Sequence, residues 1–155
     1  MSYDFVVFHC PCLDGVSSAY IAKQTALCAS SEFVPYTYSE RKTNFAEKFK
    51  DKWVLFLDFV LHENEMIEIL NVVSRITILD HHKTSLWLIK PEIMEKYGSK
   101  IHVDLRQQYS GVQLTWMFFN SFSSESELKN APWWVNAIAD GDLYTWKLSD
   151  SEALC

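Results

Sequence analysis

The feature that most constrains this chain is a regular alternation of short apolar runs with stretches of helical periodicity. The apolar runs are short enough for β-strands. After the first run, Val16, Ala19, Tyr20 and Leu27 recur at helical spacing. Because this alternation is typical of a parallel sheet covered by helices, we predict an α/β three-layer sandwich, with a mainly parallel five-stranded sheet flanked by helices. The predicted strands are residues 3–8, 33–38, 53–57, 76–79 and 101–103.

Local signals refine this outline. Pro35 lacks an amide hydrogen, which favours an edge position for the second strand. Pro91 is expected to begin a helix and Gly98 to end it. Further helices are predicted from about residue 111 to 119 and around residues 134–139. The length of 155 residues suits one domain spanning residues 1–155.

Composition excludes several classes of protein. A net charge of −6 argues against an extended nucleic-acid surface, because such surfaces need clustered Lys and Arg. No signal peptide and no apolar run long enough to cross a membrane are apparent, so no membrane partner is expected. The four cysteines form no spaced framework, which predicts a reducing, cytoplasmic setting without disulfides. They are Cys10, Cys12, Cys28 and Cys155.

Metal-competent side chains follow several of the predicted strands directly. His9 follows the first strand, Asp58 the third and Asp104 the fifth, while an Asp-His-His string at residues 80–82 follows the fourth. Ligands of open α/β sheets bind at the carboxyl ends of the strands, so these residues are expected to converge. Asp104 taken alone is better explained as a cap of the following helix. A second acidic pair, Asp140 and Asp142, fits either this site or an exposed loop.

The residue types indicate a particular chemistry. Imidazole beside carboxylate suits a borderline cation such as Mn²⁺ or Zn²⁺, whereas an all-oxygen set suits Mg²⁺ or Ca²⁺. Several such ligands can hold two cations about 3.5–4 Å apart, which together promote in-line displacement at phosphorus. The sequence therefore predicts hydrolysis of a phosphate ester or anhydride.

Four motifs in this order resemble the DHH phosphoesterase superfamily, in the branch whose first motif reads His-x-x-Cys-x-Asp-Gly. The similarity covers nearly the whole chain, and the stretch Tyr109-Ser110-Gly111 before a helix fits it as well. The motifs are His9-Cys10-Pro11-Cys12-Leu13-Asp14-Gly15, Leu57-Asp58-Phe59, Ile78-Leu79-Asp80-His81-His82-Lys83-Thr84 and Ile138-Ala139-Asp140-Gly141-Asp142-Leu143-Tyr144-Thr145-Trp146.

The resemblance implies a two-metal site with Mn²⁺ as the first expectation and Mg²⁺, Zn²⁺ or Co²⁺ as alternatives. Asp58 is implied to bridge the cations, His82 to contact the substrate phosphate and Asp80 to orient the imidazoles. Lys83 either adds a positive charge near the phosphate or is a solvated surface residue. The implied metal ligands are His9, Asp14, Asp58, His81 and Asp140.

Three departures from the superfamily pattern affect these expectations. Cys12 stands where many members carry Asp, so it is either a further metal ligand or a small packing residue. Gly141 replaces a common Arg, which removes a side chain that could contact phosphate. Members of the superfamily usually continue into a C-terminal substrate-binding domain, and none is expected in this sequence, which stops at Cys155. Either a companion domain or a second copy of the chain is a partner, or the protein works without a second domain.

The predicted function is metal-dependent hydrolysis of a phosphodiester or phosphomonoester in nucleotides or short oligonucleotides. The alternatives are a pyrophosphatase-like hydrolase and a non-catalytic module of the same fold that serves assembly or regulation. The six tryptophans are expected mostly in the core rather than stacked on bases. Trp133, Trp134 and Trp146 are candidates for covering another domain or a second copy.

Overall fold

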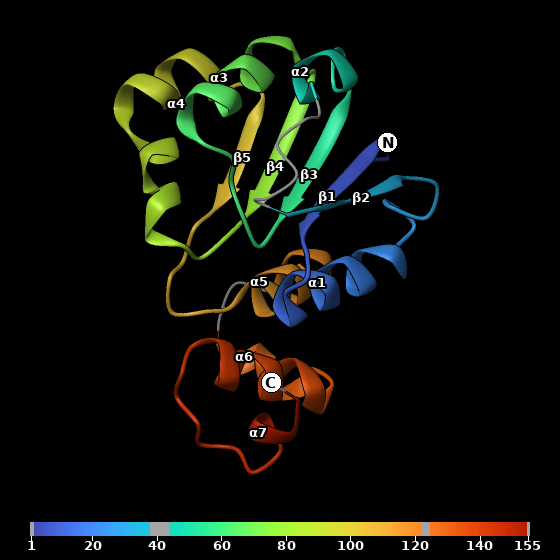
Figure 1. Ribbon diagram of the computed structural model, residues 1–155, viewed down its shortest axis with the longest axis vertical. Helices are drawn as coiled ribbons and strands as arrows, with labels where there is room; N and C mark the ends of the chain where they lie inside the picture. The colour runs from blue at the N-terminus through green and yellow to red at the C-terminus, as the bar shows by residue number, and fades with distance from the viewer. Residues whose placement is uncertain (1, 38–43, 122–124, 155) are drawn as a thin grey trace.

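The computed structural model describes residues 2–37, 44–121 and 125–154 and contains a five-stranded, entirely parallel sheet in the order β2-β1-β3-β4-β5 (Figure 1). The predicted α/β class and the parallel sheet are confirmed. The edge position predicted from Pro35 is also confirmed, since β2 is an outer strand. Tyr38, at the end of the predicted second strand, lies outside the described residues. The strands are β1 (Phe5–His9), β2 (Glu32–Tyr36), β3 (Trp53–Leu57), β4 (Arg75–Leu79) and β5 (Ile101–Asp104).

Helices cover both faces of the sheet (Figure 1). One face carries α2, α3 and α4 over a core that includes Phe49, Phe56 and Leu70, and the other carries α1 and α5 over Leu55 and Leu114. The predicted helices at 91–97 and 111–119 are confirmed. The helical segments are α1 (Leu13–Lys23), α2 (Phe45–Lys48), α3 (Glu63–Val72), η1 (Lys83–Ile89), α4 (Pro91–Tyr97), α5 (Gly111–Phe119), η2 (Glu125–Asn130), α6 (Trp133–Asp142) and α7 (Ser151–Leu154).

Helix α6 adds a layer outside α1 and α5, at the end of the molecule that also holds α7 (Figure 1). Its apolar side chains Val135 and Ile138 pack with Ile21 of α1 and Val112 of α5 in a separate small core. This packing brings the carboxyl end of α6 toward the start of α1. None of the helices in the described segments combines the length and the apolar character needed to cross a membrane.

The strand order places a topological switch point between β1 and β3. From β1 the chain moves to β2 on one side, whereas from β3 it continues outward through β4 and β5 on the other. Ligands of open α/β sheets bind in the crevice at such a point. Helix α1 can begin close to this crevice because residue 15 is glycine: a Cβ there would lie 2.3 Å from the carbonyl oxygen of His9.

Candidate metal centre

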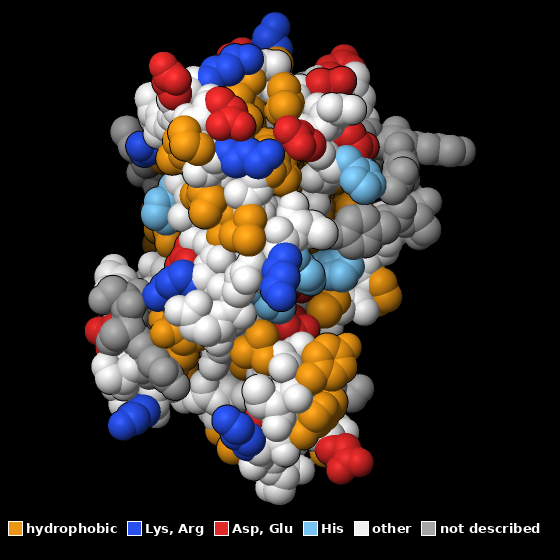
Figure 2. All heavy atoms as spheres, turned by 90° about the vertical axis from the view of Figure 1, so that its left-hand side faces the viewer, with side chains coloured by type: hydrophobic (Ala, Val, Ile, Leu, Met, Phe, Trp, Pro, Cys, Tyr) orange, Lys and Arg blue, Asp and Glu red, His pale blue; other side chains and the backbone are white. Residues whose placement is uncertain are grey.

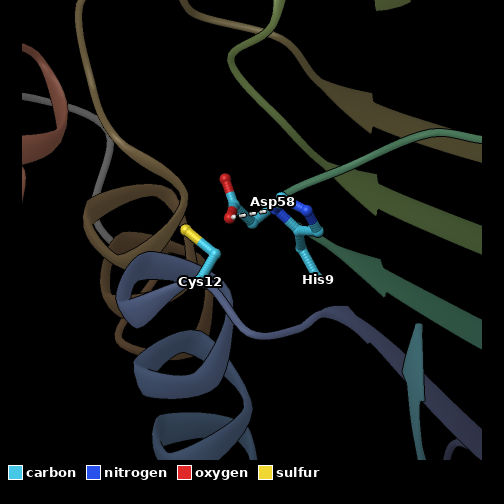
Figure 3. Close-up of side chains that lie close together, drawn as sticks. All are labelled: His9, Cys12 and Asp58. Carbon is cyan, nitrogen blue, oxygen red and sulfur yellow. Dashed lines mark ion pairs between the residues drawn. The ribbon is translucent and has the colours of Figure 1, made fainter. Parts of the chain in front are cut away.

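Three groups of metal-competent side chains lie together at the switch point. In each group, one ligand atom per residue lies within 4.8 Å of the others. Figure 3 shows the first group, in which His9 from the end of β1, Cys12 before α1 and Asp58 after β3 approach one another. The second group is Asp58, His81 and His82, and the third is Asp14, His81 and Asp142.

Asp58 lies at the middle of the site and belongs to two of the three groups. Its backbone has a left-handed φ of 65°, which Asp tolerates better than most residues, and its amide donates to the carbonyl of Leu79 at 2.9 Å. The side chain is almost fully buried. Its Oδ1 lies 3.3 Å from Nε2 of His81, and its Oδ2 lies 3.6 Å from Nδ1 of His9. This central position is what a ligand shared by two cations requires.

Asp14 lies on α1 and faces the first turn of α5. Its Oδ2 accepts a hydrogen bond from the amide of Gly111 at 2.6 Å, and its Oδ1 accepts one from Val112 at 2.9 Å. The positive end of a helix dipole stabilises such a carboxylate. A Cβ at residue 111 would lie 2.8 Å from Oδ2 of Asp14 and 2.9 Å from Oδ1 of Asp58. Glycine therefore lets α5 approach both carboxylates.

His81 links the carboxylates. Its Nε2 lies 3.3 Å from both Asp58 Oδ1 and Asp142 Oδ2, and 3.9 Å from Asp14 Oδ2. Within the described part of the chain, no hydrogen bond of normal geometry ends on either oxygen of Asp58, on Nε2 of His81 or on Oδ2 of Asp142, although all four atoms are buried. Buried polar atoms without hydrogen bonds are costly. Their mutual orientation fits coordination of a cation.

The electrostatics of the metal-free cluster lead to the same conclusion. Burial, and then the neighbouring charges of Asp58 and Asp142, raise the pKa of the Asp14 carboxyl well above its usual range. Burial also raises the pKa of Asp58, but the facing imidazoles of His81 and His9 lower it more, so the net pKa falls below its usual value. A divalent cation would neutralise the repulsion among these carboxylates.

Both imidazoles respond to the same carboxylates. The pKa of His9 is raised to about 10, chiefly by Asp58 and then by Cys12. Burial lowers the pKa of His81, but Asp58, Asp142 and Asp14 raise it more, to about 9. Pairing with these carboxylates therefore favours the protonated form of both imidazoles in the metal-free protein.

Asp80 positions the histidine pair from behind. It is fully buried, and its Oδ1 accepts hydrogen bonds from the amides of His81 at 2.9 Å and His82 at 3.3 Å. The same oxygen lies 2.7 Å from Nδ1 of His82, and Ser85 donates to its other oxygen. Asp80 raises the pKa of His82, whose side chain is half exposed at the mouth of the site. This geometry assigns the Nδ1 proton to the contact with Asp80 and leaves Nε2 for a ligand.

The remaining predicted residues lie elsewhere. Asp140, expected as a metal ligand, is not part of any of the three groups: its oxygens accept hydrogen bonds from the amides of Lys147 and Leu148, both at 2.9 Å, and from Ser151. Lys83 is exposed at the start of η1 and forms no ion pair within the described segments. Asp104 pairs with Arg106 at 2.7 Å and does not join the cluster.

Asp142 is the ligand candidate that sequence reasoning did not select. It ends α6, four residues after Ile138 and seven after Val135, the two side chains that face α1 and α5. Positions separated by four and seven residues share one face of a helix. This periodicity is the signal that distinguishes Asp142 from Asp140.

Comparisons with known proteins give a limited result. No protein-family model matches the chain. A similar protein is the uncharacterized protein R106 of Acanthamoeba polyphaga mimivirus, which is 30% identical over 159 residues. The aligned region covers 94% of this chain but only 34% of the viral protein. The chain therefore spans about a third of the length of this relative.

Proposed function

We propose that this chain is a metal-dependent phosphoesterase of the DHH type, which hydrolyses phosphodiesters or phosphomonoesters of nucleotides and short oligonucleotides. The observation that carries the proposal is the buried cluster at the β1/β3 switch point. There, Asp58, Asp142 and His81 direct buried atoms that have no hydrogen bond within the described residues toward one another, and Asp14 lies 3.9 Å from the same nitrogen of His81. A purely structural role gives no reason to bury such a set.

The donor set favours borderline divalent cations. His9, Asp58 and Cys12 would hold one cation, and Asp14, His81 and Asp142 a second, with Asp58 also within reach of His81. Nitrogen and oxygen donors together suit Mn²⁺, and also Zn²⁺ or Co²⁺, better than an all-oxygen set would. When bound, two such cations lower the pKa of water and stabilise charge on phosphoryl oxygens.

His82 is the group proposed to contact the substrate. Its Nδ1 is occupied by Asp80, and its half-exposed ring lies beside that of His81, with a ring nitrogen within 4.8 Å of ligand atoms of Asp58 and His81. Because Asp80 favours the protonated imidazole, Nε2 would donate a hydrogen bond to a phosphate oxygen and could pass a proton to the leaving oxygen. Asp80 acts as a positioning residue because it holds the ring without reaching the substrate.

Metal binding and turnover of the same variants test the proposal. We would measure bound metal by equilibrium dialysis with Mn²⁺ and hydrolysis of a dinucleotide, for the wild type, Asp58→Asn and His82→Ala. We expect two cations per wild-type chain, loss of both metal and activity in Asp58→Asn, and loss of at least about 100-fold in activity with retained metal in His82→Ala.

Asp104→Asn is the matched control. Asp104 also ends a strand of the same sheet, but its carboxylate pairs with Arg106 and not with the cluster. This variant should bind metal and hydrolyse substrate like the wild type. Equal turnover by all four proteins would refute the proposed site, whereas two bound cations without any turnover would identify a non-catalytic module.

A further inference from the structure

A pocket of about 420 Å³ opens beside the metal centre. Its lining includes Cys12, Asp14 and Asp142 of the candidate metal centre together with the aromatic residues Tyr144 and Trp146. On the face shown in Figure 2, histidine, acidic and hydrophobic side chains follow one another from the middle of the molecule downward. The volume suits a small ligand, since such sites range over roughly 300–1,000 Å³.

The two aromatic residues of this pocket are unusually exposed. Tyr144 is 81% exposed and Trp146 is 50% exposed, while their rings meet edge to face with centroids 6.4 Å apart. Both also have left-handed backbones, with φ of 56° and 49°. Bulky L residues rarely adopt this conformation, and strain of this kind concentrates at ligand sites. Core packing does not explain why both rings are exposed, and backbone preference does not explain why both residues adopt a left-handed conformation.

Asp140 holds this loop in place. Its carboxylate accepts hydrogen bonds from the amides of Lys147 and Leu148, and its carbonyl accepts one from the amide of Thr145 at 2.9 Å. Ser151 of α7 donates to the same carboxylate at 2.6 Å. These bonds fix the backbone on both sides of Trp146. The rings are therefore presented on a pre-ordered loop, which lowers the entropy cost of binding a ligand.

We propose that Tyr144 and Trp146 form a subsite for the base of a nucleotide whose phosphate lies at the metal centre. This inference rests on the proposed function and specifies its substrate class. A phosphate can approach Asp14 and Asp142 only where cations neutralise them, so the charged end of the ligand belongs at the cluster. Its flat, uncharged end then belongs on the aromatic rings, because bases stack on such rings with little regard to sequence.

Isothermal titration with AMP and with ribose 5-phosphate tests the subsite, since only AMP carries a base. The metal-loaded His82→Ala protein is used, with the variants below made in the same background, because it is expected to hold metal without consuming the ligands. We expect AMP to bind about ten-fold more tightly. Trp146→Ala should abolish most of this difference without changing the affinity for ribose 5-phosphate, and Trp146→Phe should retain it. Trp133→Ala is the matched control: Trp133 is 63% exposed on α6 but does not line the pocket.

Several results would overturn the subsite. They are equal affinity for AMP and ribose 5-phosphate, no binding of either ligand, or an equal loss of both affinities in Trp146→Ala. A change of oligomeric state in Trp146→Ala with an intact AMP preference would identify an interface between copies of the chain instead. The proposed function is judged separately. Hydrolysis of a base-free phosphodiester together with equal affinity for the two ligands would support the hydrolase and refute the subsite. Tighter binding of AMP without any hydrolysis would support the subsite and refute the hydrolase.

Discussion

Replacing Gly111 by alanine tests the packing of the candidate metal centre directly. The new Cβ would lie 2.8 Å from Oδ2 of Asp14, 2.8 Å from Cβ of Asp58 and 2.9 Å from Oδ1 of Asp58. Ordinary contacts of a Cβ begin near 3.4 Å. Asp14 cannot swing aside without losing its bonds to the amides of residues 111 and 112, so the added methyl must displace both carboxylates or the start of α5.

The expected change in the free energy of unfolding follows from two opposing effects. Overpacking of a buried site costs about 1–3 kcal/mol, and replacing glycine by alanine returns roughly 0.4–1 kcal/mol through the unfolded chain. From the middle to the upper part of these ranges, the net loss is about 1–2 kcal/mol, which lowers Tm by about 2–8 °C for a chain of this size. Displacement of carboxylates that hold a metal should also weaken Mn²⁺ binding by about ten-fold or more.

Urea denaturation of the metal-free protein and calorimetric titration with Mn²⁺ measure the two effects. Thr115→Ala is the matched control, because Thr115 is buried one turn further along α5 and donates a hydrogen bond to the carbonyl of Gly111, while none of its hydrogen bonds among the described residues reaches the carboxylates. It should lose comparable stability and keep the wild-type affinity for metal. If Gly111→Ala changes neither stability nor affinity, or if both variants lose affinity equally, the carboxylates do not depend on the close approach of α5.

Three further predictions concern the titratable residues. Asp142→Asn should reduce the Mn²⁺ bound at equilibrium dialysis from two ions to one, and unchanged stoichiometry would exclude Asp142 as a ligand. In the metal-free protein, the raised pKa values of His9 and His81 stabilise the fold fully below about pH 6.5, and this contribution is lost as pH rises through about 9 to 10. The free energy of unfolding in urea should therefore fall as the pH rises from about 6.5 to about 10. A free energy of unfolding that does not change with pH would contradict the ion pairs of His9 and His81 with the carboxylates. Asp80→Asn should lower the pKa of His82 in an NMR titration, because the carboxylate that favours the imidazolium is removed.

The fold and the placement of several site residues could be predicted because both depend on local pattern. Continuous apolar runs such as Trp53–Leu57 are typical of strands buried on both faces, and the structure buries nearly all of that run. Parallel strands bring their carboxyl ends to one edge, which is why His9, Asp58 and His81 could be placed together from sequence order alone.

The contacts that complete the site could not be predicted in this way. Asp14 and Gly111 are 97 residues apart, and nothing in their local sequences shows that one accepts a hydrogen bond from the other. That contact depends on the packing of α1 against α5 on the same face of the sheet. For Cys12, in contrast, the structure narrows a choice that the sequence left open. A cysteine at this position could be a metal ligand or a packing residue, and its place beside His9 and Asp58 favours the ligand role.

The difference between Asp140 and Asp142 shows how the surroundings of a carboxylate decide its role. Both lie at the carboxyl end of α6, where the helix dipole disfavours negative charge. The negative charge of Asp140 is stabilised by the chain itself. Backbone amides and side-chain hydroxyls donate hydrogen bonds to both of its carboxylate oxygens, and these bonds lower its pKa below the usual range. Burial raises the pKa of Asp142, and His81 offsets this only in part. The proposed metal centre would supply the missing compensation, because a cation held by His81 and Asp14 would also lie within reach of Asp142.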